Sequence, residues 1–425
     1  MGAGSGSPVR DSGVAVDRLG AGRHVDTAET PSGVEVTVHQ LQTFDGATVE
    51  GVLHTLAGAA TVVTLMHPRQ SVAHHPIIPL LLRCGVAVWT QTSRSINNDI
   101  ALVHEQTLLD AAAGMTFLRE RGFASLVTLG HSGGGTLYAF YIEQASLEPE
   151  RRIDSTPAGR PIALAGAQMP LPDGTIFLAP HPGQGQVLRH CIDPSVTDPT
   201  DPMAVDPSLD MFDPVNGFRP TPGTSHYDAD FLARYRAAQH DRIASIDAIA
   251  RDRAAEASAA RARFARSGDP VDRRAALAPR ILTTYRTDAD PRYTDLSIDP
   301  NDRHYGSLFG RRPDLINYGL VGFGRLTTPD AWLSTWSVIS TNADFVRCAP
   351  GITVPTLFCE FTGDQAAFPS DSARMVQALG AADITHRRVR GQHFGQPVEP
   401  GEPTGYSAAA EHIHEWLAGH HDTRR

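Results

Sequence analysis

One short segment does most to limit the folds open to this chain. Residues 126–137 begin as an apolar run, pass through Gly130, Ser132 and Gly134, and continue with the spacing of a helix. A short apolar run that ends at glycine is typical of a buried strand. Glycine on both sides lets a strand turn sharply into a helix and holds the serine at the tip of the turn. The pattern predicts a nucleophile elbow that exposes the Ser132 hydroxyl.

Strands and helices alternate on both sides of this turn. Strands are predicted at 34–42, 48–56, 61–66, 86–90, 125–129, 174–179, 354–361 and 384–389. Helices are predicted at 77–83, 101–121, 133–146, 371–379 and 407–417. Such alternation indicates βαβ units, and the Asp45-Gly46 turn adds an opening hairpin. The predicted fold class is α/β, with a mostly parallel sheet flanked by helices.

A long break in this alternation divides the chain into a core and an insertion. We expect residues 31–180 and 346–425 to form the two parts of the core, and residues 181–345 to form an inserted cap. Repeated Asp-Pro pairs in the insertion predict turns, and residues 228–266 predict a long, partly exposed helix. Residues 1–30 are expected to be a disordered leader, because their start is rich in glycine and serine and lacks the apolar stretch of a signal peptide.

Charge and cysteine content exclude several kinds of partner. The formal net charge is −10 and the pI is near 6.0, which disfavours a surface that binds nucleic acid. No apolar run is long enough to cross a membrane, so we expect no membrane partner. We expect a small-molecule substrate and leave a homo-oligomer open. The cysteines are far apart, as in a reduced cytoplasmic protein: Cys84, Cys191, Cys348 and Cys359.

The absence of lysine excludes whole classes of cofactor chemistry. Every one of the 37 basic residues counted as Lys or Arg is arginine. Schiff-base catalysis, pyridoxal phosphate anchoring and a P-loop all require lysine. The adjacent His74 and His75 do not form a metal pair, because neighbouring side chains on a helix diverge. We therefore expect no cofactor and no bound metal.

A serine nucleophile needs a base, and the base needs an acid to orient it. The strand predicted at 354–361 is followed closely by Asp364, and the strand at 384–389 is followed by the loop that contains His393. Both residues thus come just after strands of the predicted sheet, in the chain order serine, acid, histidine. We predict Ser132 as nucleophile, Asp364 as the orienting acid and His393 as the base.

Other ionisable groups in the same region suit these roles less well. Glu360 lies inside the predicted strand rather than after it. Asp371 begins the next predicted helix, where an N-terminal capping role is the natural interpretation. His386 lies within a strand, so a structural role suits it better than a catalytic one. We therefore favour Asp364 and His393.

The elbow, the acid and the base together resemble those of the α/β-hydrolase fold family. The resemblance covers residues 34–180 and 346–418. In that family the oxyanion hole consists of two backbone N–H groups, one from the residue after the nucleophile and one from the loop after the third strand. The resemblance therefore implies an esterase-like serine hydrolase with a large cap.

The oxyanion hole of this family can be placed on the chain with one departure. Gly133 follows the nucleophile and is the first expected donor. The second lies in loop 66–70, where Pro68 occupies the place of a family glycine. Proline has no N–H, so Arg69 is the expected second donor. His67 is expected to hold this loop by hydrogen bonds rather than to act in catalysis.

The predicted reaction is cleavage of a carboxylic ester or lactone of a small organic substrate through an acyl-enzyme on Ser132. A serine at the elbow disfavours dehalogenase and epoxide-hydrolase chemistry, for which this fold family uses an aspartate. An amidase, a C–C bond hydrolase or an acyltransferase would share the same triad, so these alternatives stay open. A non-catalytic ligand-binding protein on the same fold is an alternative of another class.

Overall fold

The computed structural model describes residues 28–423, and all but the last three residues of the predicted leader lie outside this range. Its central sheet has eight strands in the order β1-β2-β4-β3-β5-β6-β9-β10. The strands are β1 (Glu35–Gln42), β2 (Thr48–Thr55), β3 (Thr61–Met66), β4 (Ala87–Gln91), β5 (Ser125–Ser132), β6 (Gly174–Pro180), β9 (Thr356–Gly363) and β10 (Ile384–Gln392). β2 pairs antiparallel with β1 and β4, and the remaining pairs are parallel. This sheet, with a serine turn leaving β5, is an α/β-hydrolase fold and confirms the predicted class.

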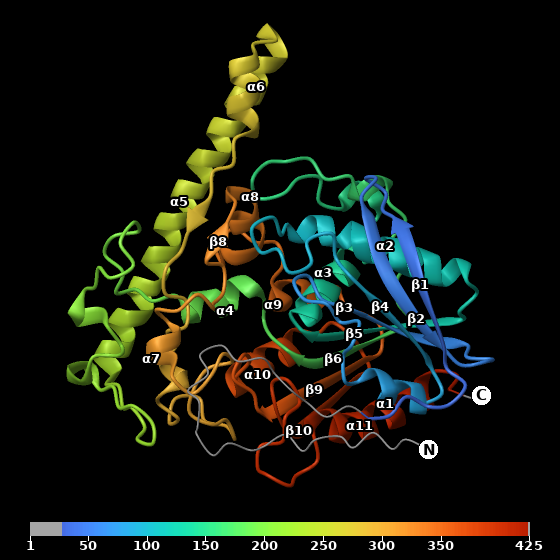
Figure 1. Cartoon of the computed structure of the whole chain (residues 1–425). Helices are drawn as coiled ribbons and strands as arrows, with labels where there is room; N and C mark the ends of the chain where they lie inside the picture. The colour runs from blue at the N-terminus through green and yellow to red at the C-terminus, as the bar shows by residue number, and fades with distance from the viewer. Residues whose placement is uncertain (1–27, 424–425) are drawn as a thin grey trace, which may run out of the picture.

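Helices cover both faces of the sheet, because alternate residues of a strand point to opposite sides. Val62 and Val63 of β3 are fully buried, yet they belong to different apolar clusters. The helices on the Val62 side include α2 (His104–Glu120), α3 (Gly133–Ser146) and α10 (Pro369–Ala378). Those on the Val63 side include α1 (Ile78–Arg83) and α11 (Gly405–His420). Figure 1 shows α2 and α3 on one side of the strands, and α1 and α11 on the other.

Core elements lie where the sequence predicts them, within a few residues. β3 and α3 coincide with their predicted ranges, and the opening hairpin turns at Asp45-Gly46, where Gly46 has φ +83°. β5 continues to Ser132, three residues beyond the predicted end, because its pairing with β6 continues through the elbow. The apolar periodicity of these segments therefore predicts the core well.

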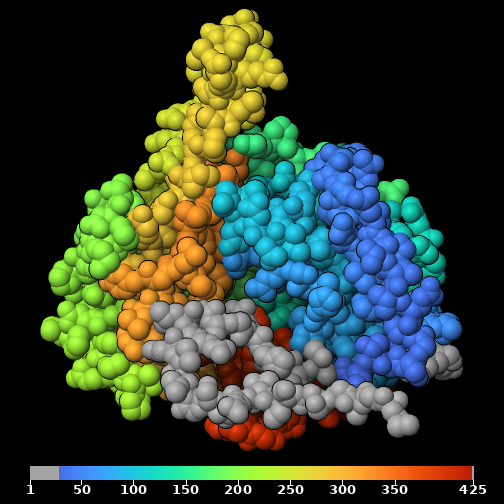
Figure 2. Space-filling model, viewed as in Figure 1, coloured from blue at the N-terminus to red at the C-terminus, as the bar shows by residue number. Residues whose placement is uncertain are grey.

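The stretch between β6 and β9 is less regular than the core. It holds α4 (Gln184–Cys191), α5 (Ala229–Ser267), α6 (Pro270–Leu277), α7 (Pro313–Ile316), α8 (Pro329–Ala331), α9 (Phe345–Cys348) and a ladder of β7 (Leu282–Thr283) with β8 (Leu326–Thr327). The predicted long helix is confirmed as α5, which Asp228 caps by accepting a hydrogen bond from the Phe231 N–H. α5 and α6 form an arm that stands out from the body (Figures 1 and 2). Neither α4 nor α6 is predicted from the sequence.

The insertion packs on loops at the carboxyl edge of the sheet. Asn301 Nδ2 donates to the carbonyl oxygen of Asp364 at 2.8 Å, in the loop after β9. His304 Nε2 lies 2.6 Å from the carbonyl oxygen of Val398, in the segment after β10. The Thr328 N–H donates to the carbonyl oxygen of Ile100, in the segment between β4 and α2. These contacts place the insertion beside the edge where parallel strands end.

Candidate active site

The elbow at Ser132 is strained in the manner that the sequence predicts. Ser132 has φ +56° and ψ −124°, a conformation that residues with side chains rarely adopt. A Cβ on Gly130 would lie 2.6 Å from the carbonyl oxygen of Gly134, and a Cβ on Gly134 would lie 2.5 Å from the carbonyl oxygen of Met66. Only glycine fits at these two positions, which is why β5 can turn directly into α3.

The structure brings the three predicted triad residues together. His393 Nε2 lies 2.8 Å from Ser132 Oγ, and His393 Nδ1 lies 2.9 and 2.8 Å from the two carboxylate oxygens of Asp364. Ser132 is 8% exposed, Asp364 2% and His393 1%. The loops after β9 and β10 deliver the acid and the base to the serine, which ends β5. The result is one continuous hydrogen-bonded chain from carboxylate to hydroxyl, largely shielded from solvent.

Backbone groups fix the carboxylate in place. Asp364 Oδ1 accepts hydrogen bonds from the N–H groups of Ala366 at 2.6 Å and Ala367 at 3.0 Å. Such bonds set the orientation of the carboxylate. The acid is therefore positioned by the turn of its own loop before it meets His393.

Two further histidines support the loop that carries His393, a role that the sequence does not single out. His131 Nε2 lies 2.9 Å from the carbonyl oxygen of His393, and His131 Nδ1 lies 3.2 Å from His75 Nε2. Burial lowers the pKa of His75 to about 4 and lowers the pKa of His131 well below its usual value. Both rings are therefore neutral near pH 7. The one feature of His131 visible in the sequence is its position directly before the nucleophile, and that position does not by itself predict the contact with His393.

The less favoured ionisable groups lie away from the triad. Glu360 accepts a hydrogen bond from Arg388 at 2.6 Å and lies 3.1 Å from His386 Nε2. Asp371 accepts from the Phe368 N–H at the start of α10 and pairs with Arg292 at 3.3 Å. Glu360 and His386 thus contact each other on the sheet, and Asp371 is the third residue of α10, which begins two positions earlier than the start predicted from the sequence.

The loop expected to supply the second oxyanion donor has a different arrangement from the one predicted. The N–H groups of Arg69 and Gln70 both donate to His67 Nδ1 at 3.0 Å. His67 therefore holds the loop by hydrogen bonds, as expected, and the Arg69 N–H already has an acceptor in the ring of this histidine. The Arg69 guanidinium pairs with Asp99 and lies 4.8 Å from the ring centre of Trp336 in the insertion.

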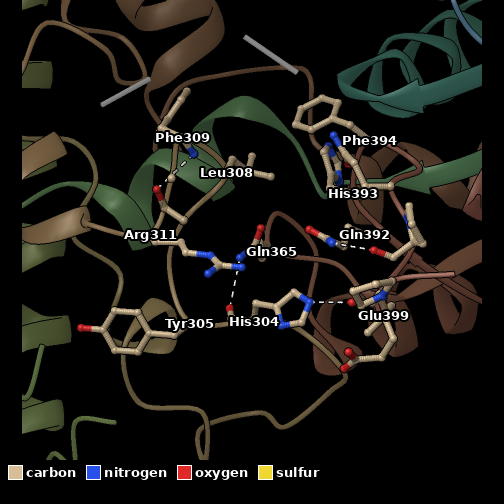
Figure 3. Close-up of a pocket in the computed structure, with 16 residues that line it drawn as sticks. His304, Tyr305, Leu308, Phe309, Arg311, Gln365, Gln392, His393, Phe394 and Glu399 are labelled. Carbon is tan, nitrogen blue, oxygen red and sulfur yellow. Dashed lines mark hydrogen bonds between the residues drawn. The ribbon is translucent and has the colours of Figure 1, made fainter. Parts of the chain in front are cut away.

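A cavity of about 650 Å³ opens beside His393. Figure 3 shows side chains of the insertion facing His393 and Phe394 across it. The lining from the insertion is mixed in character and comprises His304, Tyr305, Ser307, Leu308, Phe309, Gly310 and Arg311. Its position between insertion and base makes it a candidate space for part of a substrate.

No group of three or more His, Cys, Asp or Glu residues within 28–423 is arranged to hold a metal ion. Among the helices of that same range, none combines the length and apolar character that a membrane crossing requires. All four cysteines fall within it, and each is buried as a free thiol.

Solved structures with similar architecture share little sequence with this chain. DcsB in complex with its substrate analogue is 12% identical, with a TM-score of 0.46, and the match covers 91% of this chain and 99% of that chain. The esterase Pf2001 of Pyrococcus furiosus is 10% identical, with a TM-score of 0.44, covering 95% and 99%. A hypothetical protein from Pseudomonas aeruginosa is 11% identical, with a TM-score of 0.45, covering 95% and 99%. No family model and no curated protein matches the sequence.

Proposed function

We propose that this chain is a serine hydrolase that cleaves a carboxylic ester or lactone of a small organic substrate through an acyl-enzyme on Ser132. The observation that carries the proposal is the chain of hydrogen bonds from Asp364 through His393 to Ser132. A strained serine at the end of a strand, with a histidine at 2.8 Å, has the arrangement of an activated nucleophile.

Each residue of the triad takes one role. His393 Nε2 accepts the proton of Ser132 Oγ as the oxygen attacks the substrate carbonyl, and later gives that proton to the leaving alcohol. Asp364 keeps the other ring nitrogen protonated and stabilises the imidazolium that forms. Water, activated by the same histidine, then releases the acid and restores Ser132.

The first residue of α3 supplies one oxyanion donor. Gly133 is the first residue of its helix, so its N–H has no acceptor within the helix and adds to the positive end of the helix dipole. An alkoxide that forms on the substrate would be stabilised there. The Arg69 N–H already donates to His67, which favours another group as the second donor.

An amidase, a C–C bond hydrolase and an acyltransferase would use the same three residues, and a ligand-binding protein would use only the cavity. Ester or lactone cleavage is favoured over amide and C–C bond cleavage because an alcohol is a better leaving group than an amine or a carbanion, and transfer to water or to another acceptor is left to the assay. A panel of 4-nitrophenyl esters, lactones, anilides and acyl acceptors separates these activities.

The test begins with a fluorophosphonate probe, which reacts with an activated serine. Wild-type protein should be labelled at Ser132 and should hydrolyse at least one ester or lactone of the panel. Ser132→Ala should lose the label and reduce kcat by roughly 10⁴-fold or more, while His386→Asn, a change outside the site, should keep both. A folded wild-type protein that neither reacts with the probe nor turns over any substrate would favour the ligand-binding alternative.

A further inference from the structure

Three side-chain nitrogens converge on one point beside Gly133. A Cβ placed on this glycine would lie 2.4 Å from Gln184 Nε2, 2.9 Å from His67 Nε2 and 3.1 Å from His181 Nε2. The three side chains come from separate segments: the loop after β3, the segment after β6 and the start of α4. A side chain at Gly133 would occupy the point on which they converge, directly after the nucleophile.

Backbone hydrogen bonds decide which nitrogen of each histidine carries the proton. His67 Nδ1 accepts from the N–H groups of Arg69 and Gln70, and His181 Nδ1 accepts from the Gly183 N–H at 3.1 Å. A nitrogen that accepts a hydrogen bond has no proton, so each neutral ring carries its proton on Nε2. Both Nε2–H groups therefore present donors toward the point beside Gly133.

These two rings are neutral donors and not cations. Burial, with charged and histidine neighbours adding to it, lowers the pKa of His181 to about 3 and lowers the pKa of His67 well below its usual value. A protonated Nε2 has no lone pair to offer, so the pair suits an oxygen acceptor and not a metal ion.

Gln184 is a second and independent sign of a missing ligand. Its side chain is 2% exposed, and its amide nitrogen, the atom that lies toward Gly133, has no hydrogen-bond partner among residues 28–423, while the amide lies close enough to His104 to act on the pKa of that histidine. Buried amides are nearly always satisfied, since an unmade hydrogen bond costs about 1–3 kcal/mol. An unpaired buried amide aimed at Gly133 indicates an oxygen atom that arrives with the substrate.

We propose that the Nε2–H groups of His67 and His181, joined by the amide of Gln184, complete the oxyanion hole with the Gly133 N–H in place of the Arg69 N–H. The inference rests on the proposed hydrolase function and deepens it. As Ser132 Oγ bonds to the carbonyl carbon, the π electrons of the C=O bond move onto its oxygen, and these donors bind the resulting alkoxide. When the leaving group departs, the electron pair on that oxygen re-forms the C=O bond, the leaving oxygen takes the electrons of the bond that breaks together with the proton from His393, and no proton leaves His67 or His181.

Neutral imidazoles are well suited to this task. They donate without carrying a charge that would have to be desolvated, and their backbone hydrogen bonds fix the direction of each N–H before the substrate binds. A histidine whose pKa is lowered in this way can polarise a carbonyl group as the imidazole, without becoming an imidazolium.

Matched substitutions at His181 separate the donor from the structural contact. His181→Asn keeps an oxygen near the Nδ1 position that can accept from the Gly183 N–H, but it removes the Nε2–H donor that faces the point beside Gly133. His181→Gln places an amide N–H near the Nε2 position but loses the acceptor for Gly183. His67→Asn and Gln184→Leu extend the test to the other two donors, and His386→Asn serves as the control outside the site.

The first measurement is kcat and KM on the ester of the panel that wild type cleaves fastest. The second is the rate at which a fluorophosphonate probe modifies Ser132, because the phosphonyl oxygen of the probe occupies the same oxyanion hole. His181→Asn and His67→Asn should each lower kcat and the modification rate about 100-fold, the usual effect of one oxyanion donor. Their KM should stay near that of wild type. His181→Gln should be the more active member of its pair.

A purely structural role for His181 predicts the reverse order, with the asparagine variant more active than the glutamine variant. That order would overturn the inference, provided that wild type is still labelled at Ser132. The inference would also be overturned if the asparagine variants at both histidines kept rates within about twofold of wild type. Should wild type itself fail to react with probe and esters, the proposed function fails first and the inference with it. If His67→Asn does not fold, the His181 pair and Gln184→Leu still decide the matter.

Discussion

The core and the insertion of this molecule combine apolar packing and buried charges in different proportions. In the core, apolar residues on regular strands set the sheet, and the ends of β5, β9 and β10 place the triad. The insertion has apolar clusters of its own, but much of its chain is irregular, and buried ionic and polar contacts also hold it. Arg292 of the insertion, for example, bonds Asp290 at 2.7 Å and reaches Asp371 of α10 at 3.3 Å.

Substitutions in the two regions should therefore have different effects: in the triad they should reduce activity, and at the buried charges of the insertion they should reduce stability. Burial by itself would raise the pKa of Asp290, but Arg292 and Arg236 outweigh it and hold that pKa well below its usual value. A charge held in this way depends on its partners, because a buried charge without one is strongly unfavourable. A triad residue contributes its hydrogen bonds to the reaction, whereas the fold beneath it rests on apolar burial.

The largest effect is expected in the core, from Asp364→Asn. The N–H groups of Ala366 and Ala367 hold the amide oxygen in the place of Oδ1, so the amide nitrogen donates to His393 Nδ1 and the ring takes the tautomer that cannot accept the serine proton. We expect kcat to fall about 10⁴-fold, with a melting temperature close to that of wild type. Glu360→Gln, which changes a carboxylate on the sheet beside Arg388, is the matched control for activity.

Ester hydrolysis and thermal unfolding measured side by side check this prediction. A loss of activity below about tenfold would mean that Asp364 does not orient the base. A large fall in melting temperature would instead show that the hydrogen bonds of the triad stabilise the core. The core would then depend on paired polar groups as the insertion does.

The next effect is expected in the insertion, from Arg292→Met. The substitution keeps most of the side-chain volume over the Phe368 ring, which lies 3.7 Å from the guanidinium carbon, but leaves Asp290 without its closest partner. Breaking a buried pair in this way costs about 3–5 kcal/mol. Arg263→Met is the control, because its pair with Asp272 is largely exposed and should contribute less than about 1 kcal/mol.

Urea unfolding followed by tryptophan fluorescence reports on this change, since Trp332 and Trp336 are buried in the insertion and Trp89 and Trp416 in the core. Hydrogen exchange by mass spectrometry then locates the loss. Faster exchange in residues 181–345 with protection kept in β3 and β5 supports the contrast. Equal loss in both regions would show that core and insertion unfold as one cooperative unit.

The core side of this contrast is predictable from the sequence, and much of the insertion is not. Apolar periodicity and the glycines around Ser132 are enough to predict the sheet and its elbow. Asp364 and His393 lie in loops just after two predicted strands, and this position identifies them as the acid and the base. These signals are local, since each depends on residues adjacent in the chain. The helix α5 is predicted for the same reason, because its spacing and its N-terminal Asp228 are local too.

What could not be predicted depends on contacts between distant segments. The N–H of Arg69 is engaged by His67 within the loop, yet no sequence pattern says which ring nitrogen accepts it. His181 and Gln184 meet His67 only because α4 begins beside the elbow, and no local pattern in the sequence indicates that contact. The buried ion pairs of the insertion likewise join residues that no local pattern relates.

The smallest effect concerns a buried carboxyl group of the insertion that lacks a full set of partners. Burial raises the pKa of Asp288 to about 7, against the weaker effect of Ser307, whose hydroxyl donates to Oδ2 at 2.8 Å. Oδ1 has no hydrogen-bond partner among the residues described. In the unfolded chain this group loses its proton near its ordinary pKa, so between about pH 4 and about pH 7 the folded state holds a proton that the unfolded state lacks.

The sign of the pH dependence follows directly. Asp288 makes the free energy of unfolding fall as the pH rises through that window, and above about pH 7 the folded state carries a poorly solvated charge. Asp288→Asn keeps an acceptor for Ser307 without this charge, so it should be more stable than wild type by about 1–3 kcal/mol at pH 8, with a smaller difference near pH 5. Urea unfolding at both pH values measures the difference. A variant that is less stable at pH 8 would mean that the carboxylate is charged and stabilised by Arg325, so that Asp288 belongs with the paired charges that hold the insertion together.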